Sequence, residues 1–360
     1  MEAVEKAMGY GNIRIISPYE LQTIQHMDII RHPGEHARLT LSGIIPEEHG
    51  TSYMEHSSSR DTVEIQIVEE NGSARRLFKG IVSLLKIKAV QGIYYLELEC
   101  SSYTAIMDLK RKSRSFPNPH MTYGELIETV MSDYEQSDVL DYATGSSALG
   151  SFTLQYMETD WQFLKRMASH FGSVLMADAA GDGPKLMVGL PDGRMRSLPE
   201  EPFMVKRSLA EWMNIAFNDG HGSEGEFTAY SIVTDQSYQI GDKVMFREGE
   251  LTVVGYTAAL TDGLLSYTYM LSPLEAGMSV LRILNHEMTG ATLLGSVQEV
   301  KGHSVKVKLD IDEGRKGAAS GWFPYASAYS AEGSGGGSTI CQGPAIGYSS
   351  MCRGVRKEGP

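Results

Sequence analysis

The sequence predicts a mainly β protein with a small α+β unit, and two observations carry that prediction. Two long stretches, residues 13–114 and 203–271, are rich in segments that alternate apolar and polar residues, as strands with one buried face do. Between them, two capped helical patterns lie among short strand patterns. The 360 residues are enough for two or three cores of ordinary size, so several domains are expected.

The first block of strand patterns predicts an antiparallel sheet or barrel. Asn71-Gly72 is a strong hairpin signal and Gln91-Gly92 a weaker one, because both residues of a tight hairpin turn need positive φ. The strand patterns on either side of these turns cover residues 37–43, 63–68, 77–82, 84–89 and 93–100.

Pro117 and Pro119 mark the change to a mixed region. Thr122 followed by Glu125 forms a capping-box pattern, which predicts a helix that runs to about Tyr134. Its apolar face consists of Leu126, Ile127, Val130 and Met131.

The segment from Phe152 to Asp178 predicts a strand, a sharply capped helix and a second strand. Thr159 stands at the N-cap and Gln162 three residues later, which is a second capping box. Asp160 in the first turn, with Lys165 and Arg166 later, suits the helix dipole. Gly172 is the left-handed residue that ends the helix. One face of the helix is expected to be buried, through Trp161, Leu164, Met167, Ala168 and Phe171.

A second block of strand patterns follows, and then a third, shorter one. The second block covers residues 226–234, 238–246, 251–259 and 264–271, with turns such as Asp262-Gly263 between the strands. A short helical linker is expected around 277–287. The third block predicts two strands around Lys301-Gly302 and another strand at 321–327.

The residue order of the central helix resembles the signature of the phage late-control protein D and VgrG family, the hub proteins of contractile tails and type VI secretion-like machines. In addition, Gly-x-Val-x-x-Val, Val-x-Val and Trp-Phe-Pro after residue 292 resemble the opening of an OB-fold. The resemblance implies two tube-like antiparallel β-barrels plus a C-terminal, apparently incomplete OB-fold. It also implies a structural role for the family-motif residues Glu158, Thr159, Asp160, Trp161, Phe163, Leu164, Arg166 and Gly172.

The resemblance divides the chain as follows: a first hub β-barrel at 1–117, an α/β connector at 118–200, a second hub β-barrel at 201–276, a linker at 277–291 and an OB-fold-like segment at 292–360. After Tyr329 the strand patterning fades, so the OB barrel lacks strands that it needs. One hypothesis is that a frame disturbance replaced its end. The coding DNA tests it, because an intact frame in close relatives would contradict the idea.

The function implied by the resemblance is that of a structural hub that adapts a trimeric spike to a hexameric tube. Its expected partners are two further copies of itself, the tail tube protein, and spike-tip or baseplate proteins, with the target membrane involved only on injection. Assembly in the bacterial cytoplasm and a final place in a virion tail or injection particle are expected. The alternative is a tail-associated cell-wall hydrolase or carbohydrate-binding protein, suggested by the β-rich blocks and scattered aromatic residues.

Composition excludes several other classes. The net charge of -13 argues against nucleic-acid binding, which needs clustered basic residues. The one basic run, Lys110 to Arg114, is expected to be a solvated loop. No apolar run is long enough to span a membrane, and the N-terminus lacks a secretory signal pattern. The three cysteines, an odd number without a CxxC pair, fit a reducing compartment.

The candidate chemical residues all have simpler explanations. His32 and His36, with His49 and His56 nearby, invite a zinc site, but Pro33-Gly34 prevents a helix that would align the first two. Glu158 and Asp160 flank an N-cap, so cap and dipole roles explain them without acid–base catalysis. Trp161 and Phe163 are expected in the core, and the sequence suggests no catalytic role for His170 or His303. The sequence contains no GxSxG, HExxH or P-loop motif, and no catalytic, cofactor or metal residue is predicted.

Overall fold

The chain folds into two compact units, each made of segments that lie far apart in the sequence. The computed structural model describes residues 8–69, 72–198, 202–218, 227–246, 249–273, 282–315 and 320–324. The first unit comprises Met1–Ile106, Met131–Ala143 and Ala168–Arg282, and the second comprises Met107–Val130, Thr144–Met167 and Ile283–Pro360. Residues 118–200, predicted as one connector, therefore contribute to both units.

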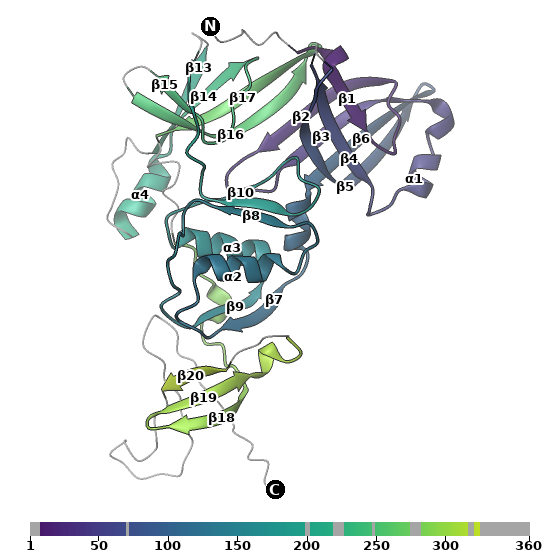
Figure 1. Cartoon of the computed structure of the whole chain (residues 1–360). Coiled ribbons are helices and arrows are strands. Elements are labelled where there is room, and N and C mark those ends of the chain that lie inside the picture. The colour runs from purple at the N-terminus through teal and green to yellow at the C-terminus, as the bar shows by residue number, and fades with distance from the viewer. Residues whose placement is uncertain are drawn as a thin grey trace. The chain divides into compact units, whose positions relative to one another are not determined.

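A twelve-stranded sheet dominates the first unit, so the prediction of a mainly β chain with large antiparallel sheets is confirmed (Figure 1). The strand order is β1-β4-β5-β6-β3-β2-β16-β17-β14-β13, with β15 beside β16 and β12 beside β15. These strands are β1 (Ile13–Ile16), β2 (Thr23–Arg31), β3 (Arg38–Ile45), β4 (Thr62–Val68), β5 (Ala74–Val90), β6 (Ile93–Ser102), β12 (Met195–Arg196), β13 (Phe203–Arg207), β14 (Thr228–Thr234), β15 (Lys243–Phe246), β16 (Gly249–Thr261) and β17 (Leu264–Ser272).

The two predicted strand blocks share this one sheet, because β2 of the first block pairs with β16 of the second. The antiparallel register places Arg31 opposite Tyr256 and Asp28 opposite Ala259. At the two ends of the path, β1 pairs with β4 and β13 pairs with β14. The closure of each block into its own tube, and the predicted domain boundaries, stay predictions.

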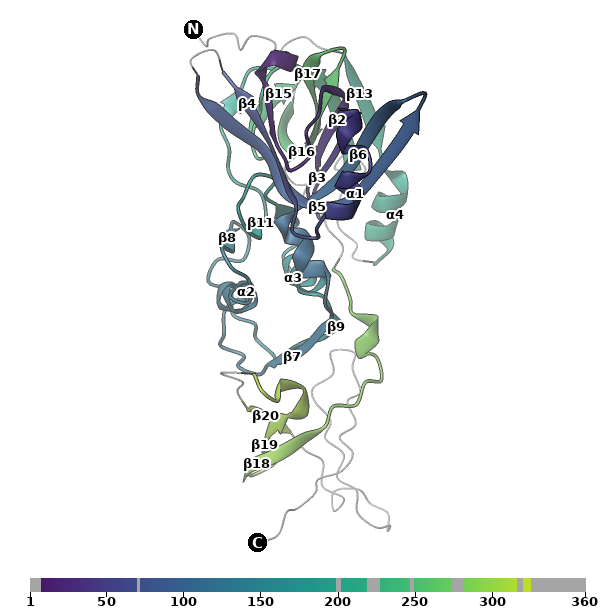
Figure 2. The same cartoon turned by 90° about the vertical axis from the view of Figure 1, so that its right-hand side faces the viewer.

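Tight turns join neighbouring strands where the sequence predicts them. Gln91 and Gly92 have φ of 51° and 81°, and Asp262 and Gly263 have 51° and 79°. Two successive residues with positive φ form the type of turn that matches the twist of a hairpin. Asn71, of the turn between β4 and β5, lies outside the described residues. The long hairpin of β5 and β6 is visible in Figure 2.

The first unit has a core of aliphatic and tyrosine side chains from the inward face of the large sheet. β3 alternates buried and half-buried residues along its length, and so does most of β17. Leu39 and Leu41 are 0% exposed, and so are Tyr269 and Leu271. A small sheet in the order β10-β11-β8 also belongs to this unit; its strands are β8 (Asp138–Asp141), β10 (Leu175–Ala177) and β11 (Lys185–Val188).

Several elements of the first unit differ from the sequence prediction. A helix, α4 (Leu209–Asn218), stands where strands were expected to resume. The strand expected at 238–246 is shorter, because β15 begins only at Lys243. Of the helical linker expected at 277–287, residues 274–281 lie outside the described part. Short helices complete the unit: η1 (Tyr10–Asn12), η2 (Glu47–His49), α1 (Ser52–His56) and most of η3 (Tyr103–Asp108).

The second unit contains a two-stranded ribbon, the two predicted helices and a C-terminal sheet. The ribbon pairs β7 (Lys112–Phe116) with β9 (Thr153–Glu158) in antiparallel register. The helices are α2 (Tyr123–Met131) and α3 (Asp160–Ser169), whose last residues are counted with the first unit. The sheet has the order β18-β19-β20, formed by β18 (Gly295–Lys301), β19 (Ser304–Leu309) and β20 (Gly321–Pro324), with η6 (His286–Met288) before it and η7 (Asp310–Asp312) between its last two strands.

The C-terminal sheet has its own small core of Val305, Val307 and Leu309, with Phe152 and Phe323 packed against it. Its three strands are those predicted for the opening of an OB-fold. The expected incomplete barrel and altered ending concern residues 325–360, which lie outside the described part. No helix of the described residues is both long and apolar enough to cross a membrane.

Candidate functional site

The start of α3 is fixed by the capping box that the sequence predicts. The Thr159 backbone N–H donates to Gln162 Oε1 at 3.2 Å, and the Gln162 backbone N–H donates to Thr159 Oγ1 at 3.1 Å. Thr159 Oγ1 also donates to the Asp108 carboxylate, which comes from the end of η3. A matching box opens α2, where the Glu125 N–H donates to Thr122 Oγ1 at 3.1 Å and Thr122 N–H to Glu125 Oε2 at 2.7 Å.

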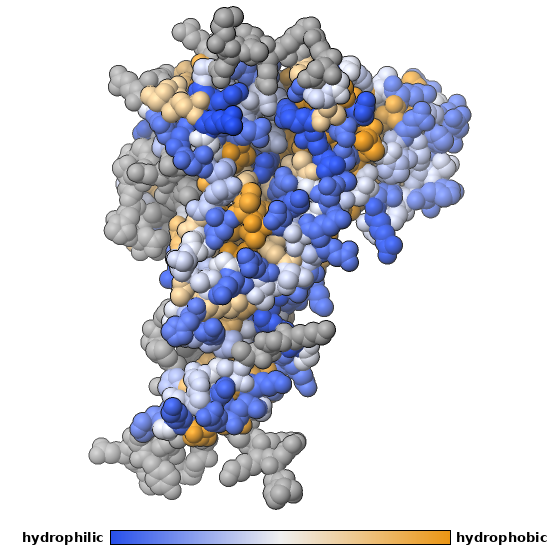
Figure 3. All heavy atoms as spheres, in the orientation of Figure 1, coloured by the Kyte–Doolittle hydropathy of each residue, from blue (hydrophilic) through white to orange (hydrophobic). Residues whose placement is uncertain are grey.

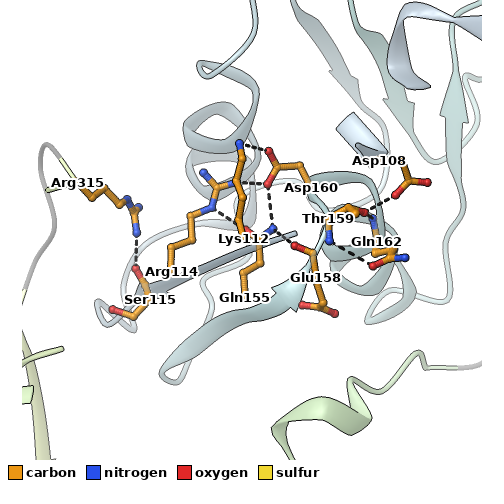
Figure 4. A network of polar contacts seen from close by, with 10 residues as sticks. All are labelled: Asp108, Lys112, Arg114, Ser115, Gln155, Glu158, Thr159, Asp160, Gln162 and Arg315. Carbon is orange, nitrogen blue, oxygen red and sulfur yellow. Dashed lines mark hydrogen bonds and ion pairs between the residues drawn. The ribbon is translucent and has the colours of Figure 1, made fainter. Parts of the chain in front are cut away.

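Asp160 is the centre of a buried polar network (Figure 4). Its side chain is 0% exposed and binds Lys112 Nζ at 2.5 Å and Arg114 Nη2 at 2.5 Å. Gln155 of β9 completes the arrangement, because its amide donates to Asp160 Oδ1 at 2.9 Å and accepts from Arg114 Nε at 2.6 Å. A buried carboxylate is tolerated only when it is paired and hydrogen-bonded, and Asp160 is both.

Glu158 forms a second buried ion pair on the same motif. Both of its carboxylate oxygens accept from the Arg166 guanidinium, Oε1 from Nε at 2.8 Å and Oε2 from Nη2 at 2.8 Å. Arg166 Nη2 also donates to the carbonyl of Leu154 at 2.6 Å, which ties the helix to strand β9. This two-bond geometry is the strongest form of carboxylate recognition by arginine.

The structure extends one prediction about charged residues and corrects another. Asp160 lies in the first turn of α3, as predicted, and both Glu158 and Asp160 also pair with basic side chains. The run Lys110 to Arg114 was predicted to be a solvated loop, but Lys112 and Arg114 lie on β7 and Arg114 is 6% exposed. The reason is the β7–β9 pairing, which places these bases against the carboxylate of Asp160.

The apolar motif residues lie in the interior. Trp161 is 3% exposed, Phe163 0% and Leu164 1%. Phe163 stacks on Phe116 of β7, with ring centres 5.7 Å apart and planes 15° from parallel. Burial therefore extends beyond the single stripe expected, because the ribbon covers a further side of the helix. Gly172, which follows α3, has φ of 59°, the left-handed conformation expected at a helix end.

The histidines flagged by the sequence do not converge. His36 Nδ1 lies 2.9 Å from Thr104 Oγ1, His49 stacks on Tyr53 and His56 Nδ1 lies 2.8 Å from the Ser52 carbonyl. Burial lowers the pKa of His32, an effect to which Arg38 adds while Glu35 opposes it. Among the described residues, no group of three or more His, Cys, Asp or Glu has the arrangement of a metal site.

Each motif carboxylate is therefore paired with basic side chains, Asp160 with Lys112 and Arg114, and Glu158 with Arg166. Sequence patterns missed the basic partners of Asp160 because they come from a strand more than 40 positions earlier. The available signal was the alternation of Lys112 and Arg114, which places both on one face of a strand.

Comparisons with known proteins point to proteins of phage tails. Residues 57–211 match the family model described as phage tail baseplate hub (GPD). A search among curated proteins finds no match.

Solved structures of tail and secretion proteins share the fold. The E. coli c3393 protein, described as a component of the type VI secretion system with structural similarity to T4 bacteriophage tail proteins gp27 and gp5, matches with a TM-score of 0.62 and 14% identity over 86% of this chain and 92% of that one. The 43 kDa tail protein of prophage MuSo2 from Shewanella oneidensis has a TM-score of 0.55 and 12% identity over 73% and 98%. The tail protein of Neisseria meningitidis MC58 has a TM-score of 0.53 and 14% identity over 74% of this chain and 99% of that one.

The fold is that of a mainly β protein, and it is shared with tail and secretion proteins. Residues 57–211, less than half of the 360-residue chain, are similar to the phage tail baseplate hub family.

Proposed function

We propose that the chain is the central hub of a contractile phage tail or a related injection machine. Three copies would form a ring that adapts a trimeric spike to a hexameric tail tube. The observation that carries the proposal is the joining of two strand blocks into one sheet through β2 and β16. Each copy thus supplies two consecutive sheet segments, and three copies would present six to a sixfold tube.

The ends of the sheet are suited to contacts between copies. Strand β13 is exposed along its whole length and carries Phe203, Met204 and Val205, which are 40%, 65% and 47% exposed. Figure 3 shows apolar side chains, in orange, in the region of β13 to β15. An exposed apolar edge strand is a template for pairing with another chain. We propose that β13 of one copy lies against the next copy in the ring.

The proposed partners follow from this role. They are the tail tube protein on one side of the ring, and spike-tip or baseplate proteins on the other. The predicted divisions at residues 117, 200, 276 and 291 are proposed as the boundaries of hub barrels, connector, linker and OB-fold-like segment. The proposed site of assembly is the bacterial cytoplasm, and the proposed destination is a tail or injection particle.

Oligomeric mass tests the hub proposal. Native mass spectrometry and light scattering of the purified chain should give a trimer. Met204→Lys and Val205→Lys should shift the mass towards the monomer, because charge on an edge strand opposes pairing. Leu109→Lys, at a position 81% exposed in the second unit, is the matched control and should remain trimeric.

The proposal also holds that the chain does not cleave cell wall, and a cell-wall turbidity assay tests this. The chain should not clear a suspension of purified cell wall. A monomer that clears the suspension would contradict the hub proposal and support the alternative of a tail-associated hydrolase.

A further inference from the structure

Asp312, at the end of η7, is a buried carboxylate whose partners lie on strand β7. It is 2% exposed, and it accepts hydrogen bonds from the Ser115 backbone N–H at 2.9 Å and from Ser115 Oγ at 2.5 Å. Ser115 precedes Asp312 by 197 positions and is itself 3% exposed. The contact therefore joins the C-terminal segment to the ribbon that carries the motif.

Arg315 completes the contact from the other side. Its Nη1 donates to the Ser115 carbonyl at 2.8 Å, as Figure 4 shows, and to Asp312 Oδ1 at 3.2 Å. Ser115 faces Leu154 across the ribbon, and these bonds occupy both backbone groups of Ser115 on side chains of the C-terminal segment. Buried backbone groups need hydrogen-bond partners. Asp312 and Arg315 bond the N–H and the carbonyl of Ser115, as a neighbouring strand would do along β7.

Stacked groups continue this contact into the motif helix. The Arg315 guanidinium carbon lies 4.8 Å from the ring centre of Phe116, which stacks on Phe163 of α3. The guanidinium carbon of Arg166 lies 5.2 Å from the ring centre of Phe163. Arg315 and Arg166 thus each lie against one ring of the stacked pair, a contact that is favourable between a cation and an aromatic ring. One of these arginines belongs to the motif and the other to the C-terminal segment.

Apolar contacts hold the sheet against the same ribbon. Phe152, just before β9, meets Phe323 of β20 edge to face with ring centres 5.1 Å apart. A Cβ added to Gly321 would lie 2.7 Å from Pro117 Cβ, so the sheet approaches the end of β7 closely. In both Figure 1 and Figure 2 the β18–β20 sheet lies next to the β7–β9 ribbon.

We propose that the motif helix and its ribbon form a docking receptor for the C-terminal sheet of the same chain, with Asp312 and Arg315 as the latching residues. The buried ion pairs of Asp160 and Glu158 hold the ribbon against α3, and the outer edge of that ribbon receives the latch. The C-terminal sheet of the same chain is thus the partner that docks on the ribbon. The docking does not depend on assembly into a ring, so it is separable from the hub proposal.

Hydrogen exchange of the full chain, followed by mass spectrometry, tests the latch. Asp312→Asn and Arg315→Met should each speed exchange in peptides covering 112–116 and 304–315 by about ten- to a hundredfold, the effect of removing a charged hydrogen bond from a buried partner. Peptides from β16 and β17 should keep wild-type rates. The matched control is Glu313→Gln, at an exposed neighbouring position, which should match wild type throughout.

Two further variants keep the test decisive if Asp312→Asn fails to fold. Ser115→Ala removes only the hydroxyl bond and should speed exchange by a smaller factor. Arg315→Lys keeps the charge but loses the planar stacking on Phe116, and should fall between wild type and Arg315→Met. Exchange in the latch variants equal to that of Glu313→Gln would overturn the proposal. A monomeric but normally protected chain would count against the hub and leave the latch intact.

Discussion

Arg114 of β7 and Asp160 of α3 are 46 positions apart in the sequence, and their side chains meet at 2.5 Å with almost no exposure to solvent. Arg114 binds Oδ1 of the Asp160 carboxylate, and Lys112 binds Oδ2. The motif acid therefore compensates two basic groups that the fold brings into the interior.

Replacing Asp160 by Asn should destabilise the second unit by about 3–5 kcal/mol, because it leaves buried positive charge without its counter-ion. Urea denaturation followed by tryptophan fluorescence measures the loss. The matched control is Glu97→Gln, which breaks the Glu97–Lys86 pair whose side chains are 44% and 53% exposed. That change should cost at most about 1 kcal/mol. Equal losses in the two variants would contradict the importance of the Asp160 network.

Replacing Thr159 by Ala should cost about 1–2 kcal/mol, the upper part of the range for a lost N-cap, because the hydroxyl also binds Asp108. Thr159→Ser keeps the hydroxyl and should remain within about 0.5 kcal/mol of wild type. Thermal unfolding followed by circular dichroism compares the two. A Ser variant as unstable as the Ala variant would assign the effect to the lost methyl group instead.

His32 should make the fold less stable as the solution is acidified. Burial lowers its pKa in the folded state below the ordinary value of 6.5, so the unfolded chain binds the proton more readily. The stabilising contribution is complete above the unfolded pKa and is lost as pH falls through the lower folded value. Denaturation midpoints measured from about pH 8 to about pH 5 should fall less steeply in His32→Gln than in wild type.

The control for that measurement is Met54→Gln, which replaces a non-titrating residue at an exposed position of α1. It should keep the wild-type pH dependence. An unchanged slope in His32→Gln would show that other groups dominate the acid response.

Local patterns predicted what local chemistry determines. The strand–helix–strand order of residues 152–178, both capping boxes and the turns at Gln91-Gly92 and Asp262-Gly263 all depend on residues a few positions apart. The alternation of apolar and polar residues did not reveal strand β2, because a bulge between Ile24 and His26 shifts its apolar residues out of phase. The helical spacing of Leu209, Trp212, Met213, Ala216 and Phe217 was present for α4 but lay in a region dominated by strand patterns.

Contacts between distant segments could not be predicted in this way. No pattern in β7 alone names Asp160 or Asp312 as its partner, because those contacts depend on how the ribbon pairs and where the C-terminal segment returns. The family resemblance supplied the hub role but not the use of its motif acids as counter-ions.

The pairing of β2 with β16 has a consequence for how the protein is made. About 220 residues separate the end of β2 from the start of β16, so at ~5–20 residues per second the ribosome takes ~10–40 s to deliver the strand that covers the β2 edge. A first block that folds on the ribosome would keep the β2 edge unpaired during that interval, and an unpaired strand edge is a template for aggregation. A chaperone that covers this edge would act at that stage.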